Sequence, residues 1–154
     1  MNITTMSMQK YKSISSLWNV MLKEQATGLV KRLLPSNTPI KVFATYRHSD
    51  EVCGIAFSYS ENLKVSIDSF LNLKELYVQL YLDAAYKSKK LLIIQLSSEI
   101  NKDIFAYLCD SLIESIENCE TESKAIKVVI NRLEKWKSMF AKGASDGLSV
   151  IEQQ

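Results

Sequence analysis

The sequence has a single histidine, His48, and only four glycines among its 154 residues. It contains no Gly-rich phosphate loop, no G-x-S-x-G nucleophile turn and no His-Glu-x-x-His metal-binding helix. An independent enzyme made from this chain would therefore have to work with carboxylates and lysines.

The cysteines are also few. Cys53, Cys109 and Cys119 form no Cys-x-x-Cys pair, whereas a structural zinc site takes about four Cys or His ligands, usually in close pairs. We expect reduced thiols in or near the core and no metal site. Nucleophilic Cys–His chemistry could use only His48, which lies in the turn-like stretch "RHSDE".

Long apolar runs are missing as well. The longest candidate, "LLIIQL" at Leu91 to Leu96, is far shorter than the roughly 20 residues that a membrane span needs. The start "MNITTMSMQK" lacks the basic and apolar segments of a secretory signal, so we expect a cytoplasmic protein without membrane association. The net charge of +2 does not by itself indicate nucleic-acid binding, which depends on clustered Lys and Arg.

Apolar periodicity predicts the elements of the first two thirds of the chain. Helical spacing of Leu17, Met21 or Val20, Leu29 and Leu33 predicts one helix over Ser13 to Leu34, weakened at Gly28. Two-residue alternation then predicts a mainly antiparallel sheet of about five strands, with "HSD" as the first hairpin turn. The expected strands cover residues 40–47, 51–59, 63–67, 76–82 and 91–96.

Helical spacing returns after Ser97. One stripe is formed by Ile104, Phe105, Leu108, Leu112 and Ile116, with Asn101 and Asp103 as candidate N-caps. A second helix is expected from Thr121, with Trp136 on its buried side and Gly143 near its end. The prediction is an α+β fold with an N-terminal helix, the sheet, and two C-terminal helices packed on one sheet face.

The last residues suggest a division of the chain. "GASDG" at 143–147 resembles a hinge, and Ser149 with Glu152 has the spacing of a capping box at a helix start. A single helical turn is unstable alone. We therefore expect residues 1–143 to form one domain, and residues 144–154 to form a hinge and the first turn of a following domain.

A nuclease-type metal site would need acidic residues and an Asp/Glu-x-Lys triplet on a strand. The only triplet found is Glu122-Ser123-Lys124, which lies at an expected helix start, where a carboxylate favours the helix dipole. We assign no catalytic residue on this basis.

Two groups of lysines could contact DNA phosphates. Lys87, Lys89 and Lys90 cluster in "YKSKK", and Lys124, Lys127, Lys135 and Lys142 can share one helix side. The alternative is an ordinary solvated face, since Glu114, Glu117 and Glu134 are nearby in the sequence. Tyr77 and Tyr81 could likewise be a base-stacking platform or merely the outer side of a half-buried sheet.

The C-terminal part carries a family pattern. A strand leads to the helix "DIFAYLCDSLIESI", then come Arg132, Leu133 and Trp136 of an Arg-Leu-x-x-Trp pattern, and finally Gly147, Leu148, Ser149, Glu152 and Gln153. Over Leu91 to Gln154 this resembles the N-terminal region of a bacterial PD-(D/E)XK-motif family, which is restriction-endonuclease-like. Lys137 departs from it, because the family usually has Gln there.

The resemblance implies a parent protein that is a magnesium-dependent DNA endonuclease of a restriction or anti-phage defence system, with DNA or other defence proteins as partners. In the family the nuclease-like core follows the "E-Q" segment, so no catalytic or metal position maps onto this chain. We therefore expect a non-catalytic domain that positions DNA or a partner. The alternatives are a self-contained protein-interaction or oligomerisation module and, ranked last, an independent enzyme.

Overall fold

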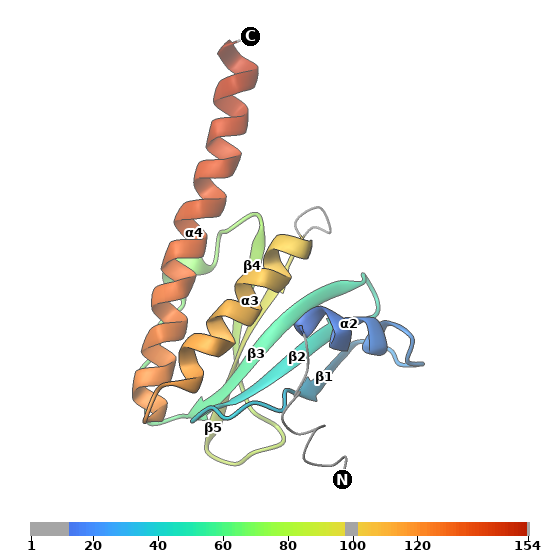
Figure 1. The fold of residues 1–154 in the computed structure, drawn as a ribbon, viewed down its shortest axis with the longest axis vertical. Helices are drawn as coiled ribbons and strands as arrows, with labels where there is room; N and C mark the ends of the chain where they lie inside the picture. The colour runs from blue at the N-terminus through green and yellow to red at the C-terminus, as the bar shows by residue number, and fades with distance from the viewer. Residues whose placement is uncertain (1–12, 98–101, 154) are drawn as a thin grey trace.

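A five-stranded antiparallel sheet covered on one face by helices forms the body of the protein (Figure 1). The computed structural model describes residues 13–97 and 102–153, and side chains in residues 13–97 and 102–140. The expected α+β fold is confirmed. The elements in chain order are α2 (Ile14–Leu22), β1 (Leu29–Leu33), β2 (Lys41–Arg47), β3 (Val52–Ser60), η1 (Asp68–Phe70), β4 (Leu76–Leu82), β5 (Lys89–Leu96), α3 (Lys102–Glu117) and α4 (Glu122–Gln153).

The strands are ordered β1-β2-β3-β5-β4, so that β5 is inserted between β3 and β4. Every neighbouring pair is antiparallel. Since side chains alternate along each strand, paired residues share a face. Tyr46, Cys53, Ile55 and Ile94 belong to the main core beneath the helices, whereas Phe43 and Ile93 lie on the opposite face in a smaller cluster.

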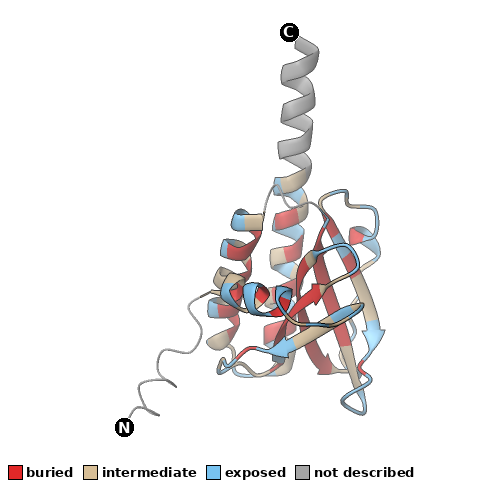
Figure 2. Cartoon of the chain, turned by 90° about the vertical axis from the view of Figure 1, so that its right-hand side faces the viewer, coloured by how far each residue is buried: buried red, intermediate tan, exposed pale blue. Residues whose placement is uncertain are grey.

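Aromatic rings join the three helices to the sheet. Trp18 of α2 stacks on Phe105 of α3 with ring centroids 5.8 Å apart, and Phe105 meets Trp136 of α4 edge-on at 6.1 Å. The indole nitrogen of Trp18 donates to the carbonyl oxygen of Gly54 at 2.9 Å. Figure 2 colours the buried residues red, along the strands and on parts of the helices packed against them. Trp136 lies on the buried side of its helix, as expected, and Trp18 is fully buried.

The expected helix over residues 13–34 is wrong beyond Leu22. Ser13 and the α3 residue Asp110 cap its start, because Asp110 accepts from the Ile14 backbone N–H at 2.9 Å. Gly28 has φ +75°, which ends any helical continuation. Leu29–Leu33 then pairs with β2 as an edge strand, so pairing with a distant strand overrides the local helical pattern.

The expected strand at residues 63–67 is also wrong. This segment has no regular structure, and Leu63, Val65 and Ile67 instead pack, partly buried, against the main core. Their alternation therefore reflects packing without sheet pairing. The hairpin turn at residues 48–50 and the other four strands are confirmed.

The C-terminal helices differ from the expectation in three respects. Ile104, which was expected on the buried stripe, is 54% exposed. Asp103, a candidate N-cap, lies inside the first turn of α3, and the other candidate, Asn101, is outside the described residues. α4 begins at Glu122, one residue after the expected start at Thr121. It neither ends at Gly143 nor restarts at Ser149, since it runs to Gln153. A glycine costs a helix only about 1 kcal/mol, and no proline follows to end it. None of the described helices is long and apolar enough to cross a membrane.

Candidate functional site

One lysine of the β4–β5 group contacts the first residue of α4, the helix that carries the second group. Lys87 lies in the β4–β5 turn, and Lys89 and Lys90 begin β5. The Lys89 ammonium nitrogen is 3.3 Å from a carboxylate oxygen of Glu122, the first residue of α4. This contact ties the turn to the helix that carries the second group.

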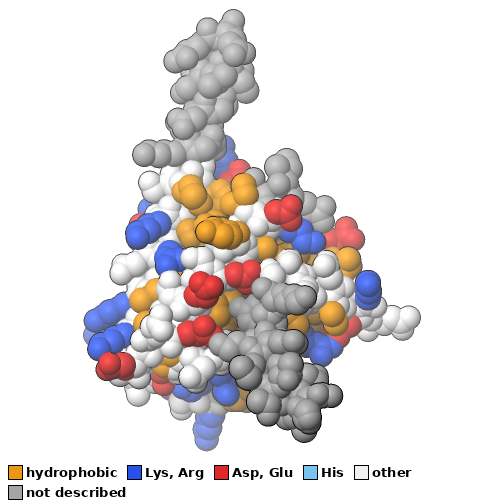
Figure 3. All heavy atoms as spheres, in the orientation of Figure 1, with side chains coloured by type: hydrophobic (Ala, Val, Ile, Leu, Met, Phe, Trp, Pro, Cys, Tyr) orange, Lys and Arg blue, Asp and Glu red, His pale blue; other side chains and the backbone are white. Residues whose placement is uncertain are grey.

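The helix lysines occupy one side of α4. At 3.6 residues per turn, Lys124 and Lys135 lie within about 20° of each other around the axis, and Lys127 lies about 60° away. All three are exposed, and Lys124 is 3.7 Å from Glu120. Figure 3 shows Lys and Arg side chains along this side of the molecule, with acidic ones near them. The Lys142 side chain lies outside the described residues.

The Glu122-Ser123-Lys124 triplet lies at a helix start, as expected, and Glu122 is already engaged. Its Oε1 accepts from the Ser60 backbone N–H at 3.0 Å and from the Lys89 ammonium at 3.3 Å. In the described part of the chain, no three His, Cys, Asp or Glu side chains gather into a metal-binding group. Glu122 therefore serves as a link between β3, β5 and α4.

A second candidate site lies on the sheet face opposite the helices, which we call the open face. A cavity of about 410 Å³ is set into it. Its residues come from β1, β2, β4, β5 and the β4–β5 turn; they are Leu29, Val30, Lys31, Thr45, Arg47, Gln79, Tyr81, Leu82, Ala84, Leu91 and Ile93. An apolar base with a few polar groups around it is the usual composition of a ligand site.

A buried carboxylate holds one side of the open face together. Asp83 is 6% exposed; its oxygens accept from the Ser58 hydroxyl at 2.7 Å and the Ala85 backbone N–H at 2.9 Å, and Lys31 is 3.4 Å away. Burial opposes ionisation most strongly, but the Ser58 hydrogen bond, the Ala85 N–H and the Lys31 charge together lower the pKa of Asp83 below its usual value. Asp83 is thus an anion that orients Lys31.

The open face combines cations with aromatic rings. Arg47 donates to both carboxylate oxygens of Asp50, at 2.8 and 3.0 Å, and lies 5.9 Å from the ring centroid of Tyr77. The Lys31 nitrogen is 4.5 Å from the Phe43 ring centroid. Tyr77 and Tyr81 are each 47% exposed. Both tyrosines therefore stand beside basic side chains.

Sequence reasoning missed Lys31 and Arg47 as site residues. Lys31 fell inside the expected helix, and Arg47 was noted only as part of a strand. Gly28, which adopts a positive φ, was the local sign in the sequence that a strand could begin there. The partner of that strand is β2, in an antiparallel register that pairs Lys31 with Thr45.

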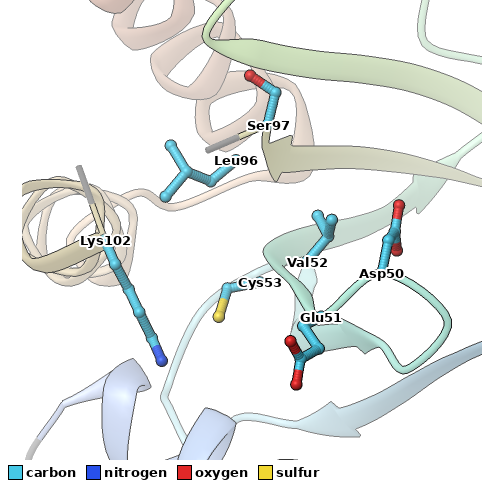
Figure 4. A pocket seen from close by; sticks show the side chains of 7 residues that line it. All are labelled: Asp50, Glu51, Val52, Cys53, Leu96, Ser97 and Lys102. Atoms are coloured by element: carbon cyan, nitrogen blue, oxygen red, sulfur yellow. The ribbon is translucent and has the colours of Figure 1, made fainter. Parts of the chain in front are cut away.

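A smaller cavity of about 40 Å³ lies where β3 begins and β5 ends. Figure 4 shows the Glu51 carboxylate, the Cys53 sulfur and the Lys102 side chain around it. It holds a few water molecules at most. His48 does not line this cavity, and its ring packs edge-on against Tyr46, with ring centroids 4.9 Å apart.

The three cysteines are free thiols, as expected. Cys53 and Cys109 are buried, and Cys119 is partly buried. Burial, followed by the nearby Asp110 and Cys53, raises the pKa of the Cys109 thiol well above its ordinary value. Cys109 is therefore a neutral core residue and not a thiolate nucleophile.

The Arg-Leu-x-x-Trp pattern has a structural explanation. Arg132 donates to the hydroxyls of Ser111 and Ser115 on α3, at 3.3 and 2.5 Å. Leu133 and Trp136 are 0% and 2% exposed. These residues hold α4 against α3 and leave the lysine side of α4 in solvent.

A family model described as "Putative PD-(D/E)XK family member, (DUF4420)" matches residues 14–154. No curated protein and no solved structure matches the chain.

Proposed function

Because the chain belongs to the DUF4420 family of PD-(D/E)XK-type proteins, we propose that it is the non-catalytic N-terminal part of a DNA endonuclease of a restriction or anti-phage system. Its role is to position duplex DNA, with other defence proteins as further partners, for a catalytic segment. Residues 1–143 form the accessory domain in this proposal, and residues 144–154 lead into the next one.

One observation carries the non-catalytic part of the proposal. The acidic residue of the Glu122-Ser123-Lys124 triplet begins a helix and is bound by the Ser60 N–H and the Lys89 ammonium. A carboxylate that holds a catalytic magnesium needs its oxygens directed to the ion, beside other acidic ligands. Glu122 has neither a free orientation nor such neighbours among the described residues.

PD-(D/E)XK nucleases are typically magnesium-dependent, but the described residues do not fit that ion. Buried Asp83 is the strongest acidic candidate, and its two oxygens already accept from Ser58, Ala85 and Lys31. A lone carboxylate with satisfied oxygens is a poor site for magnesium, which prefers several oxygen ligands in octahedral geometry. We therefore derive no metal-dependent step from this part of the protein.

The lysines at the β4–β5 turn and on α4 support the DNA-positioning role. Glu122 neutralises part of the charge of Lys89, whereas Lys87, Lys127 and Lys135 are exposed and available for phosphate contacts. A surface of this kind contacts phosphates without reading the sequence, so binding falls steeply as salt rises. The test is the anisotropy of a labelled 20-base-pair duplex titrated with the chain at several salt concentrations. Salt-sensitive binding supports the proposal, and no binding at low salt overturns it.

The second candidate is a self-contained protein-interaction or oligomerisation module. It is favoured by exposed apolar side chains on α3 and α4, where Tyr107 is 73%, Ile104 54% and Met139 43% exposed. Figure 3 shows apolar side chains grouped beside the part of α4 that leaves the sheet. Sedimentation velocity of the chain and of Tyr107→Ser tests it. Self-association that the substitution abolishes would favour this candidate.

A further inference from the structure

The open face contains polar side chains that are buried without partners. The hydroxyl of Thr45 and both amide atoms of Gln95 have no hydrogen-bond partner among the described residues, although these residues are only 0% and 1% exposed. Buried polar groups in proteins are nearly always hydrogen-bonded, so such groups require an explanation. Thr45 also lines the 410 Å³ cavity.

The sheet register brings these unpartnered groups together. Thr45 pairs with Gly54, and Gly54 pairs with Gln95, so the three residues form one row on the open face. A Cβ on Gly54 would lie 2.9 Å from the Cγ of Gln95 and would also meet the Thr45 hydroxyl. The absence of a side chain at Gly54 therefore leaves room for the Thr45 hydroxyl and the Gln95 side chain.

The cavity next to this row is built for a flat, amphipathic ring. Leu91 and Ile93 give it an apolar base, and the half-exposed ring of Tyr81 stands at its border. The volume falls in the ~300–1,000 Å³ range of small-ligand sites. The amide of Gln79 adds a further donor and acceptor to the lining.

Two cations give the cavity a charge that suits a phosphate. Lys31 and Arg47 line it, and each is held in place by one carboxylate, Asp83 and Asp50 respectively. An ammonium has three N–H donors and a guanidinium has five, so both retain donors after these ion pairs. A ring with polar edge atoms and an attached phosphate is a nucleotide.

We propose that this cavity binds one unstacked base of a single DNA strand. The nucleobase stacks on Tyr81 and on the apolar side chains of Leu91 and Ile93, and its polar edge pairs with Thr45. Its phosphate contacts Lys31 or Arg47. A base inside a duplex is stacked on both faces and cannot enter such a recess. The inference rests on the proposed function, because the unpaired strand is part of the DNA that the protein positions in that proposal.

The test compares a labelled 12-nucleotide single strand with the matching duplex by fluorescence anisotropy. Tyr81→Ala removes the stacking ring, and Thr45→Val removes the hydroxyl with little change of volume. We expect Tyr81→Ala to weaken single-strand binding by about 5- to 150-fold, the range for losing one stacked base. The matched control Tyr107→Ala changes an exposed tyrosine of α3, away from the open face, and leaves binding unchanged.

A merely structural role is separated by stability measurements on the same variants. Thr45→Val removes an unpartnered buried hydroxyl, so we expect the chain to be as stable as before while single-strand binding falls. Single-strand binding that both variants retain overturns the inference and leaves the proposed function intact. If the chain binds the duplex but not the single strand, the inference is also overturned and the proposed function stands. If the chain binds neither form, the inference and the proposed function are both overturned.

Discussion

Lys89 and Glu122 form an ion pair, 3.3 Å between nitrogen and oxygen, that joins the first residue of β5 to the first residue of α4. Each side chain is 33% exposed. Such a half-exposed pair adds little stability by itself. Its consequence is geometric, because it fixes the start of β5 to the start of α4, the helix that carries the second group of lysines.

The first prediction concerns this basic surface. The double substitution Lys87→Glu and Lys90→Glu leaves the Lys89–Glu122 pair intact and reverses two neighbouring charges. We expect duplex affinity to fall by at least about 10-fold, and the slope of log K against log salt to become shallower by about 2, since each lost phosphate contact contributes about 0.9. Anisotropy titrations at three salt concentrations measure both quantities.

Lys74→Glu is the matched control for that experiment. Lys74 is exposed just before β4, about 20 Å along the strand from the β4–β5 turn. We expect its reversal to change duplex affinity much less. Equal losses in the control and the double variant would mean that overall charge, and no particular surface, governs binding.

A second prediction tests the aromatic link between helix and sheet. Trp18→Phe removes the N–H that donates to Gly54 and leaves space in the core. We expect a loss of about 2 kcal/mol in the free energy of unfolding and a lower Tm, from the lost hydrogen bond and the smaller ring. Urea unfolding followed by circular dichroism measures it. A variant as stable as the wild type would contradict the packing described for α2.

A third prediction concerns Gly54. In Gly54→Ala the new methyl would meet the Thr45 side chain and lie 2.8 Å from the Ile94 carbonyl oxygen. Overpacking of this kind costs about 1–3 kcal/mol. Because Thr45 supplies part of the clash, we expect Gly54→Ala to cost less in a Thr45→Ala background. A double-mutant cycle on unfolding free energies measures this coupling, and strictly additive effects would contradict it.

A fourth prediction is a pH dependence. Burial raises the pKa of Tyr59 to about 12, and its phenol oxygen has no partner among the described residues. The unfolded tyrosine ionises near pH 10, so the unfolded state releases its proton first and the folded state loses stability as pH rises from about 10 to about 12.

Tyr59→Phe should remove that part of the alkaline loss and leave stability at pH 7 equal or higher, because no hydrogen bond is lost. Unfolding free energies between pH 7 and 12 measure it, with Tyr107→Phe on exposed α3 as the control. An unchanged alkaline loss in Tyr59→Phe would show that the phenol of Tyr59 is solvated in the folded protein.

Local patterns sufficed for β2, β3, β4 and β5 and for the buried stripes of α3 and α4, but they also predicted a strand at residues 63–67 that does not form. The alternation around Ile55 and the helical stripe of Phe105 and Leu112 follow directly from such burial. β1 could not be found in this way, because Lys31 and its neighbours form a strand only by pairing with β2.

The open-face site was beyond sequence reasoning for the same physical reason. Lys31, Thr45 and Tyr81 come from three strands far apart in the chain. The insertion of β5 between β3 and β4 decides which of these strands are close, and no local pattern contains that order. The lysine groups were recognisable in the sequence, but the contact of Lys89 with Glu122 was not.

The most direct test of the central claim measures binding and cleavage of one labelled duplex in the same samples with magnesium present. The account predicts salt-sensitive binding of the duplex by this chain and no cleavage at any magnesium concentration. Magnesium-dependent cleavage that is lost in Glu122→Gln would contradict the account, because it would make the helix-start carboxylate catalytic.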